Sequence, residues 1–109
     1  MASVSISIHV NKDITSDVNG AISRALEICG GIAESYAKLR CPVDTGNLRN
    51  SITHNQADEN TELIGSAVEY APYVELGTYK MAARPYLVPA VEEHVEEYKA
   101  VIINELKGS

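Results

Sequence analysis

The hydrophobic period of the chain changes between residues 10 and 14, and this change is the strongest constraint on its fold. Residues 3–10, SVSISIHV, alternate strictly between polar and apolar side chains, which predicts a half-buried β-strand. From Ile14 to Tyr36, apolar side chains instead recur every three or four residues, which predicts one stripe of a long amphipathic helix. The chain therefore begins with a strand and a helix that must each bury one apolar face.

The long helix is expected over residues 15–39. Asp13 or Thr15 can cap its first turn, because either side chain can accept a hydrogen bond from an unpaired N–H group. Pro42 ends the helix, because its ring disfavours helical geometry at the preceding residue. The pair Gly30–Gly31 lies inside it, where each glycine costs about 1 kcal/mol relative to alanine. A bend or the close approach of a neighbouring element would explain such a pair, and we favour the close approach.

The middle of the chain predicts a β-hairpin. The stretch CPVDTGN has the composition of a turn. The segment LRNSITHNQ that follows is expected to be extended, after a helical start that places Leu48 and Ile52 together. Polar residues 57–60 form the tip, and TELIGSAVEY returns as an antiparallel strand with Leu63 and Gly65 on one face.

A second amphipathic helix closes the chain. It begins near Pro85 or Val88, and Pro89 is tolerated near its first turn because an N–H group there would be unpaired anyway. Its apolar stripe consists of Val91, Val95, Tyr98, Ile102 and Leu106. We therefore predict an α+β fold: a small, mainly antiparallel sheet covered on one face by the long N-terminal helix and the C-terminal helix, within a single domain over residues 1–109.

Charge and composition exclude several kinds of partner. Fifteen acidic residues face nine basic ones, giving a net charge of −6, which argues against binding to nucleic-acid phosphates or to an anionic membrane. No apolar run approaches the roughly 20 residues that span a bilayer. The N-terminal MASVSISIHV lacks the basic and apolar regions of a signal peptide. Cys29 and Cys41 are then expected to be reduced thiols, with Cys29 acting as a small hydrophobic residue.

The sequence contains no pattern typical of a cofactor or metal site. His9, His54 and His94 have no metal-site spacing, the glycines form no phosphate loop, and no serine lies in a G-x-S-x-G elbow. We therefore expect no cofactor, no metal and no catalysis. The alternative is a small hydrolase that uses Glu75 with His54 or Asp44, which would require these groups to converge in one pocket.

The stretch YAPYVELGT, residues 70–78, reads as a structural corner. Pro72 is suited to the first turn of a short helix and Gly77 to its end. Glu75 lies between aliphatic neighbours, and a buried carboxylate needs a cation, for which Arg84 and Arg49 are the candidates. The side chains expected to pack this turn on the sheet are Tyr70, Tyr73, Val74 and Leu76.

Three blocks of the chain, in this order, resemble the head–tail joining and tail-component family of long-tailed bacteriophages, the tail-completion or neck proteins of the gene-product-ten type. The blocks are CPVDTGNLRNSI (41–52), YAPYVELGT (70–78) and MAARPYLVPA (81–90). Leu76 and Tyr86 depart from the family pattern, where an aromatic residue and a Phe are common. The resemblance implies that the motif residues form fold corners and subunit contacts. They are Pro42, Asp44, Thr45, Gly46, Leu48, Tyr70, Tyr73, Glu75, Gly77, Thr78, Arg84, Pro85 and Pro89.

The resemblance further implies a non-catalytic virion assembly protein that completes or joins the tail at the head–tail junction, by docking and ring formation. A tail terminator or a head-side connector is the alternative within the same class. The expected partners are other phage neck, connector or tail proteins and further copies of the chain in a ring, while the isolated chain can be a monomer. No sequence-specific nucleic acid and no membrane is expected. The protein is expected in the host cytoplasm during assembly and then in the virion.

Two surfaces are candidates for such contacts. The irregular crossing over residues 79–85 carries residue types enriched in interfaces, at a place where loops commonly bind partners. These interface candidates are Tyr79, Lys80, Met81 and Arg84. The alternative is an ordinary connection packed on its own domain. The second candidate is an acidic face that would line a DNA channel or meet a partner, formed by Glu92, Glu93, Glu96 and Glu97.

Overall fold

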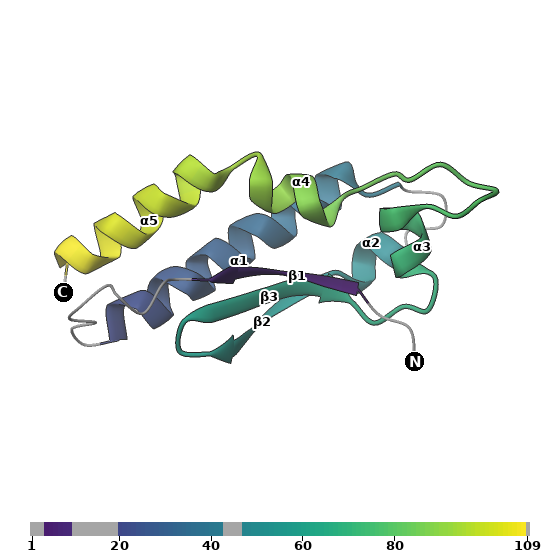
Figure 1. Ribbon diagram of the computed structural model, residues 1–109. Coiled ribbons are helices and arrows are strands. Elements are labelled where there is room, and N and C mark those ends of the chain that lie inside the picture. Colours follow the sequence, from purple (N-terminus) through teal and green to yellow (C-terminus); the bar gives the residue numbers. More distant parts are fainter. Residues whose placement is uncertain (1–3, 10–19, 43–46, 109) are drawn as a thin grey trace.

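A computed structural model describes residues 4–9, 20–42 and 47–108 of the chain, and Figure 1 shows the arrangement of their helices and strands. The elements are β1 (Val4–His9), α1 (Ala21–Arg40), α2 (Asn47–Ser51), β2 (Thr53–Asp58), β3 (Thr61–Ser66), α3 (Ala71–Leu76), α4 (Leu87–Glu92) and α5 (Val95–Gly108). Within these ranges no helix is long and apolar enough to cross a bilayer.

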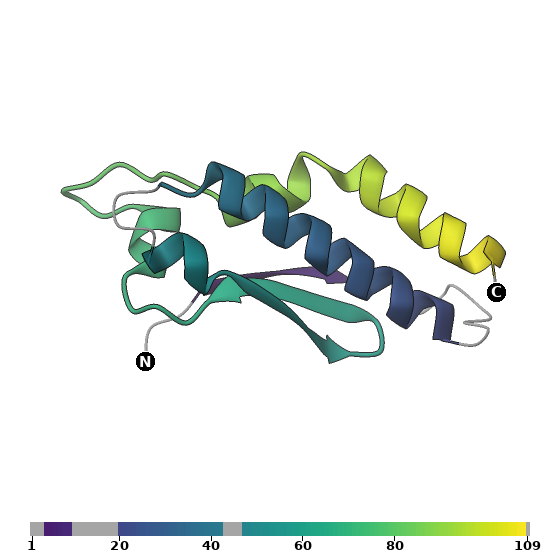
Figure 2. The same cartoon turned by 180° about the vertical axis from the view of Figure 1, so that it is seen from behind.

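The sheet has three strands in the order β1-β3-β2, and both pairs of neighbours are antiparallel. Ile64 in the central strand pairs with Ile6 on one side and with His54 on the other. Helix α1 crosses one face of this sheet, α4 packs on α1 and β1, and α5 packs along α1 (Figures 1 and 2). The predicted α+β fold, with both helices on one face of an antiparallel sheet, is confirmed.

The buried face of β3 carries Glu62, Ile64 and Ser66, and all three are buried. Leu63 and Gly65 do share a face, but it is the opposite one, which no helix among the described elements covers. A carboxylate and a hydroxyl therefore lie beneath α1 while the leucine lies outside. Alternation in β3 alone could not identify the inner face, because both candidate faces mix polar and apolar residues.

Helix α1 begins later than the sequence predicts. It starts at Ala21, and Gly20 before it has φ 70°, in the left-handed region that glycine adopts without steric cost. A single unbroken helix from residue 15 is therefore wrong, while the proposed caps Asp13 and Thr15 lie outside the described residues. The end is as predicted: α1 stops at Arg40, and the Cys41 N–H donates to the Ala37 carbonyl at 2.9 Å.

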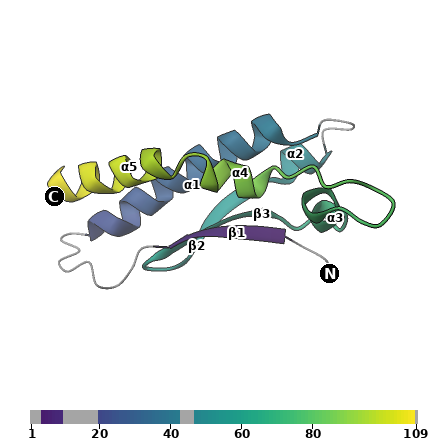
Figure 3. The ribbon, with the colours of Figure 1, turned by 45° about the horizontal axis from the view of Figure 1, so that its top comes forward.

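The C-terminal helix is two helices rather than one, as Figure 3 shows. In a continuous helix the Ala90 carbonyl would accept from the His94 N–H. Here the His94 N–H donates instead to the Val91 carbonyl at 3.3 Å, and the Tyr98 hydroxyl donates to the Ala90 carbonyl at 2.6 Å. Tyr98 is buried, so its hydroxyl needs a buried acceptor, and the break supplies one.

The predicted apolar stripe of this region is only partly correct. Tyr98 and Ile102 pack on the main core, and Leu106 packs with Ile22 and Leu26 at the other end of α1. Val95, at the start of α5, is instead exposed. The break before α5 changes the phase of the helix, so a stripe drawn through both helices misplaces this residue.

Candidate functional site

The corner predicted from YAPYVELGT is present and is built around Glu75. Helix α3 has Pro72 in its first turn, and it ends at Gly77, which has φ 79°. Ala71 and Glu75 are the buried residues of this helix. Glu75 is only 4% exposed, so its carboxylate must find partners inside the protein.

The partners of Glu75 are the backbone amides at the start of α4. The N–H groups of Tyr86 and Leu87 donate to Glu75 Oε1 at 3.0 and 2.9 Å, and the Val88 N–H donates to Oε2 at 3.1 Å. The next residue, Pro89, has no N–H group. One carboxylate therefore satisfies every free donor in the first turn of α4, where a negative charge is also favoured by the helix dipole.

The prediction that Glu75 forms an ion pair with Arg84 or Arg49 is wrong. Among the described residues, Glu75 forms no ion pair, and its hydrogen-bond partners are the three amides. Both arginines nevertheless lie in the same region, because their positive charges lower the pKa of the Cys41 thiol while burial and Glu75 raise it. Burial has the largest effect, so the net direction is a raised pKa.

The aromatic residues of this corner face outward, contrary to the expectation that they pack on the sheet. Tyr70 and Tyr73 are exposed, and Leu76 is 73% exposed. Only Val74 of the four residues packs against the core, together with the buried Ala71. Because α3 has just six residues, one inward face holds only two or three side chains, and Ala71, Val74 and Glu75 occupy it.

The segment over residues 78–85, which we call the tip loop, projects from one end of the molecule (Figure 1). All eight of its residues are exposed, and Tyr79 is 94% exposed. The Thr78 N–H donates to the Met81 carbonyl at 2.8 Å, and the Thr78 hydroxyl accepts from the N–H groups of Lys80 and Met81. The Arg84 N–H donates to the Val74 carbonyl at 2.8 Å. These bonds form a turn at Thr78–Met81 and tie the end of the loop to α3.

Gly77 fixes the direction in which the tip loop leaves α3. A Cβ atom at this position would lie 2.7 Å from the Ala83 backbone nitrogen and 3.0 Å from the Met81 carbonyl oxygen. Both neighbours are backbone atoms, which cannot rotate away. The positive φ and the lack of space therefore both require glycine here.

The four glutamates of the predicted acidic face are all exposed around the α4–α5 junction. Two of them have firm partners within the chain. Arg40 donates to Glu93 at 3.1 Å, and the Tyr36 hydroxyl donates to Glu97 at 2.6 Å. Glu96 has only a 3.8 Å contact with Lys99, and within the described part of the chain Glu92 has no ionic or hydrogen-bonding partner.

A buried polar pair between β2 and β3 was not predicted. Glu62 is 1% exposed, and its Oε2 lies 2.7 Å from His54 Nδ1, while its Oε1 has no hydrogen-bond partner. Gly30 of α1 lies directly above this pair, because a Cβ atom there would lie 2.6 Å from His54 Nδ1 and 2.8 Å from Glu62 Cδ. The predicted close approach at Gly30–Gly31 is thus confirmed for Gly30. The two consecutive glycines were the sequence signal for the His54–Glu62 pair beneath the helix.

The candidate acid–base residues have separate partners. His54 contacts Glu62, and Glu75 is bound to the amides of residues 86–88. Asp44 lies outside the described residues, as do Thr45 and Gly46 of the same turn. The contacts therefore assemble no acid–base pair from Glu75 and His54.

The other histidines contact neighbouring side chains, and both cysteines are buried. His9 lies 2.7 Å from the Thr61 hydroxyl, and the His94 ring stacks on Tyr36 with 3.6 Å between centroids. Cys29 and Cys41 are buried free thiols, and burial is the main cause that raises the pKa of Cys29 to about 11. In the described ranges no three metal-ligating side chains gather to hold an ion.

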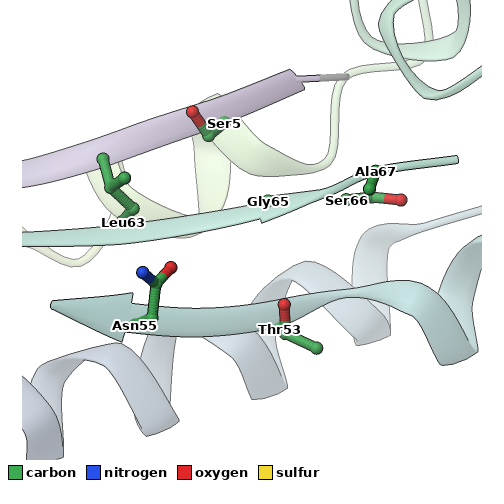
Figure 4. A pocket seen from close by; sticks show the side chains of 7 residues that line it. All are labelled: Ser5, Thr53, Asn55, Leu63, Gly65, Ser66 and Ala67. Atoms are coloured by element: carbon green, nitrogen blue, oxygen red, sulfur yellow. The ribbon is translucent and has the colours of Figure 1, made fainter. Parts of the chain in front are cut away.

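The outer face of the sheet carries a shallow depression lined by small and polar residues, shown in Figure 4. Ser5, Thr53 and Asn55 contribute its polar groups, and Leu63 and Gly65 lie between them. The figure shows these short side chains along three neighbouring strands, with no charged group among them. Such a surface offers little with which to activate a substrate.

Comparison with known proteins identifies one family. The family model described as "Bacteriophage HK97-gp10, putative tail-component" matches residues 8–77, which is more than half of the chain. No curated protein matches this chain, and no solved structure matches it either. The matched region includes the blocks 41–52 and 70–77 and ends at Gly77, so the third block, 81–90, lies beyond it.

Proposed function

The chain belongs to the HK97-gp10-like family of phage tail components, and from that premise we propose that it completes or joins the tail at the head–tail junction. In this proposal it is a structural protein of the virion tail that acts by docking and forming a ring with further copies. It performs no chemistry. Its neighbours would be other neck, connector or tail proteins.

The observation that carries this proposal is the use of Glu75. The only fully buried carboxylate of the family-matched corner is occupied by three backbone amides, so it positions α4 instead of transferring protons. A residue that supports the base of a projecting loop is what a docking protein requires. The hydrolase alternative needs the same carboxylate to be accessible to a substrate, and at 4% exposure it is not.

The tip loop is our proposed docking element. Tyr79 and Met81 are exposed apolar side chains, next to Lys80 and Arg84, on a loop whose backbone hydrogen bonds join Thr78 to Met81 and Arg84 to Val74 of α3. A pre-ordered loop loses little conformational entropy on binding. The alternative of a connection packed on its own domain is not favoured by eight consecutive exposed residues.

A stop codon in the gene, in its own phage or prophage, tests the proposed function. Electron microscopy of the lysate should show filled heads beside separate tails, or tails that do not attach, and a plasmid copy of the gene should restore whole particles. Complete and infectious particles without the plasmid would overturn the proposal.

A second test concerns the acidic face as a channel lining or partner surface. Replacing Glu92, Glu93, Glu96 and Glu97 with Gln should impair particle assembly or DNA ejection, because a wall that repels phosphate would be lost. Unchanged infectivity of this quadruple variant would count against the role, while leaving the location in the tail untouched.

A further inference from the structure

We infer that the tip loop of one chain docks on the α4–α5 junction of a second copy of this chain, in a head-to-tail contact. The receiving surface, which we call the acceptor face, consists of Glu92, Val95 and Glu96. This inference rests on the proposed function, because it names the partner of the tip loop.

The tip loop combines apolar area with positive charge. Tyr79 is almost fully exposed, and Lys80 Nζ lies 5.5 Å from the centre of the Tyr79 ring. Within the described part of the chain, Lys80 has no carboxylate partner. Met81 adds a second exposed apolar side chain. A surface with the opposite charge around an exposed apolar residue would complement this loop.

The acceptor face has that composition. Glu93 and Glu97 are engaged by Arg40 and Tyr36, which leaves Glu92 and Glu96 as the carboxylates available to a partner. Glu96 is 89% exposed, and its contact with Lys99 is long. Val95 lies next to Glu96 in the chain and is exposed, although the apolar pattern predicts that it is buried. Val95 can therefore contact the Tyr79 ring, while the carboxylates of Glu92 and Glu96 can pair with the Lys80 ammonium group.

The two surfaces lie at different places on one molecule. The tip loop projects from one end, whereas the acceptor face lies where α4 meets α5 (Figures 1 and 3). Contact between two different surfaces is heterologous, so each bound copy presents a new loop and a new acceptor face. Such contacts close into rings or continue as filaments.

The overall charge makes local complementarity necessary. Two copies that each carry −6 repel one another at a distance. A contact between copies therefore needs a cationic group at the point of approach, and Lys80 supplies one on the exposed tip loop. We expect the association to weaken as salt is added, because exposed charge pairs are screened.

Cross-linking tests the contact directly. Tyr79→Cys is placed in one chain and Val95→Cys in a second, differently tagged chain, and the two are mixed with a short bismaleimide. The native thiols of Cys29 and Cys41 are buried, so the new thiols should react first. Ile28→Cys on α1 is the matched control, because Ile28 and Val95 have the same exposure of 42%. The same pairs are also co-expressed during particle assembly, since the contact can require a template.

The inference predicts severalfold more mixed product for the Tyr79→Cys and Val95→Cys pair than for the control pair. Lys80→Glu should abolish the excess, and adding Glu96→Lys to the partner should restore it. Equal yields from both pairs, in solution and in particles, would overturn the inference, as would a dominant product between two Tyr79→Cys chains. If Lys80→Glu separates heads from tails while the cross-link yields stay equal, the loop docks on another tail protein, and the proposed function survives without this inference.

Discussion

Replacing Gly30 with alanine should destabilise the protein, although alanine is the better helix former. Gly30 lies in α1 above the buried pair of His54 and Glu62. The new Cβ atom would lie 2.6 Å from His54 Nδ1 and 2.8 Å from Glu62 Cδ, far inside the ordinary contact distance of about 3.5–4.0 Å. The pair, which is 2.7 Å apart, would have to open or α1 would have to move off the sheet.

The magnitude follows from two opposing effects. Leaving the buried Glu62 side chain without its hydrogen bond to His54 costs about 3 kcal/mol, the upper end of the range for an unsatisfied buried polar group. Alanine in place of glycine in a helix interior contributes about 1 kcal/mol in the opposite direction. We therefore expect the free energy of unfolding to fall by about 2 kcal/mol, a large share of the 5–15 kcal/mol typical of a domain.

The neighbouring glycine supplies the control. A Cβ atom at Gly31 would lie 3.9 Å from His54 Nε2, an ordinary contact, so Gly31→Ala should stabilise the protein by about 1 kcal/mol. The chain has no tryptophan, so urea unfolding is followed by far-ultraviolet circular dichroism. If Gly30→Ala is as stable as Gly31→Ala, the His54–Glu62 pair does not limit the approach of α1 and the reasoning is refuted.

Three further predictions concern the corner and the core. Glu75→Gln should lower the free energy of unfolding by about 1–3 kcal/mol, because a neutral amide replaces the charged acceptor of three backbone N–H groups. In the same urea assay, the exposed control Glu92→Gln should change the free energy of unfolding by less than about 0.5 kcal/mol. Equal effects of the two substitutions would contradict the role of Glu75. Tyr98→Phe should cost about 1–2 kcal/mol by leaving the Ala90 carbonyl without its donor, whereas Tyr79→Phe, at an exposed site, should cost nothing measurable. Cys29 has a pKa of about 11, so at a pH near the ordinary thiol pKa of about 8.5 it should resist alkylation in the folded protein and react once urea unfolds the chain. Mass spectrometry that finds Cys29 labelled in the folded protein would show that the thiol is accessible.

The sequence predicts those parts of the fold that depend on local pattern. Strict alternation identifies β1, and Pro42 correctly predicts the end of α1. Pro72 marks the start of α3 because its ring restricts the backbone there, and Gly77 marks the end because it adopts the positive φ. Each of these signals acts within a few residues of the structure that it determines.

The errors arise where distant residues meet. Glu75 accepts hydrogen bonds from amides eleven to thirteen residues later in the chain, and no charge pattern reveals donors that belong to the backbone. The break between α4 and α5 depends on a hydroxyl that reaches back to Ala90, so a continuous apolar stripe conceals it. The buried Glu62 is matched by His54 across the strand pair, which becomes visible only once the register is known.

Locating the protein in purified particles tests the central claim most directly. Antibody-bound gold against a tag placed on this chain, viewed by electron microscopy beside mass spectrometry of the same particles, shows whether the chain is part of the virion and where it lies. The account predicts that the protein is present in particles and that gold gathers where the head meets the tail. Particles that lack the protein, with all of it left in the host fraction, would contradict a structural role in the tail.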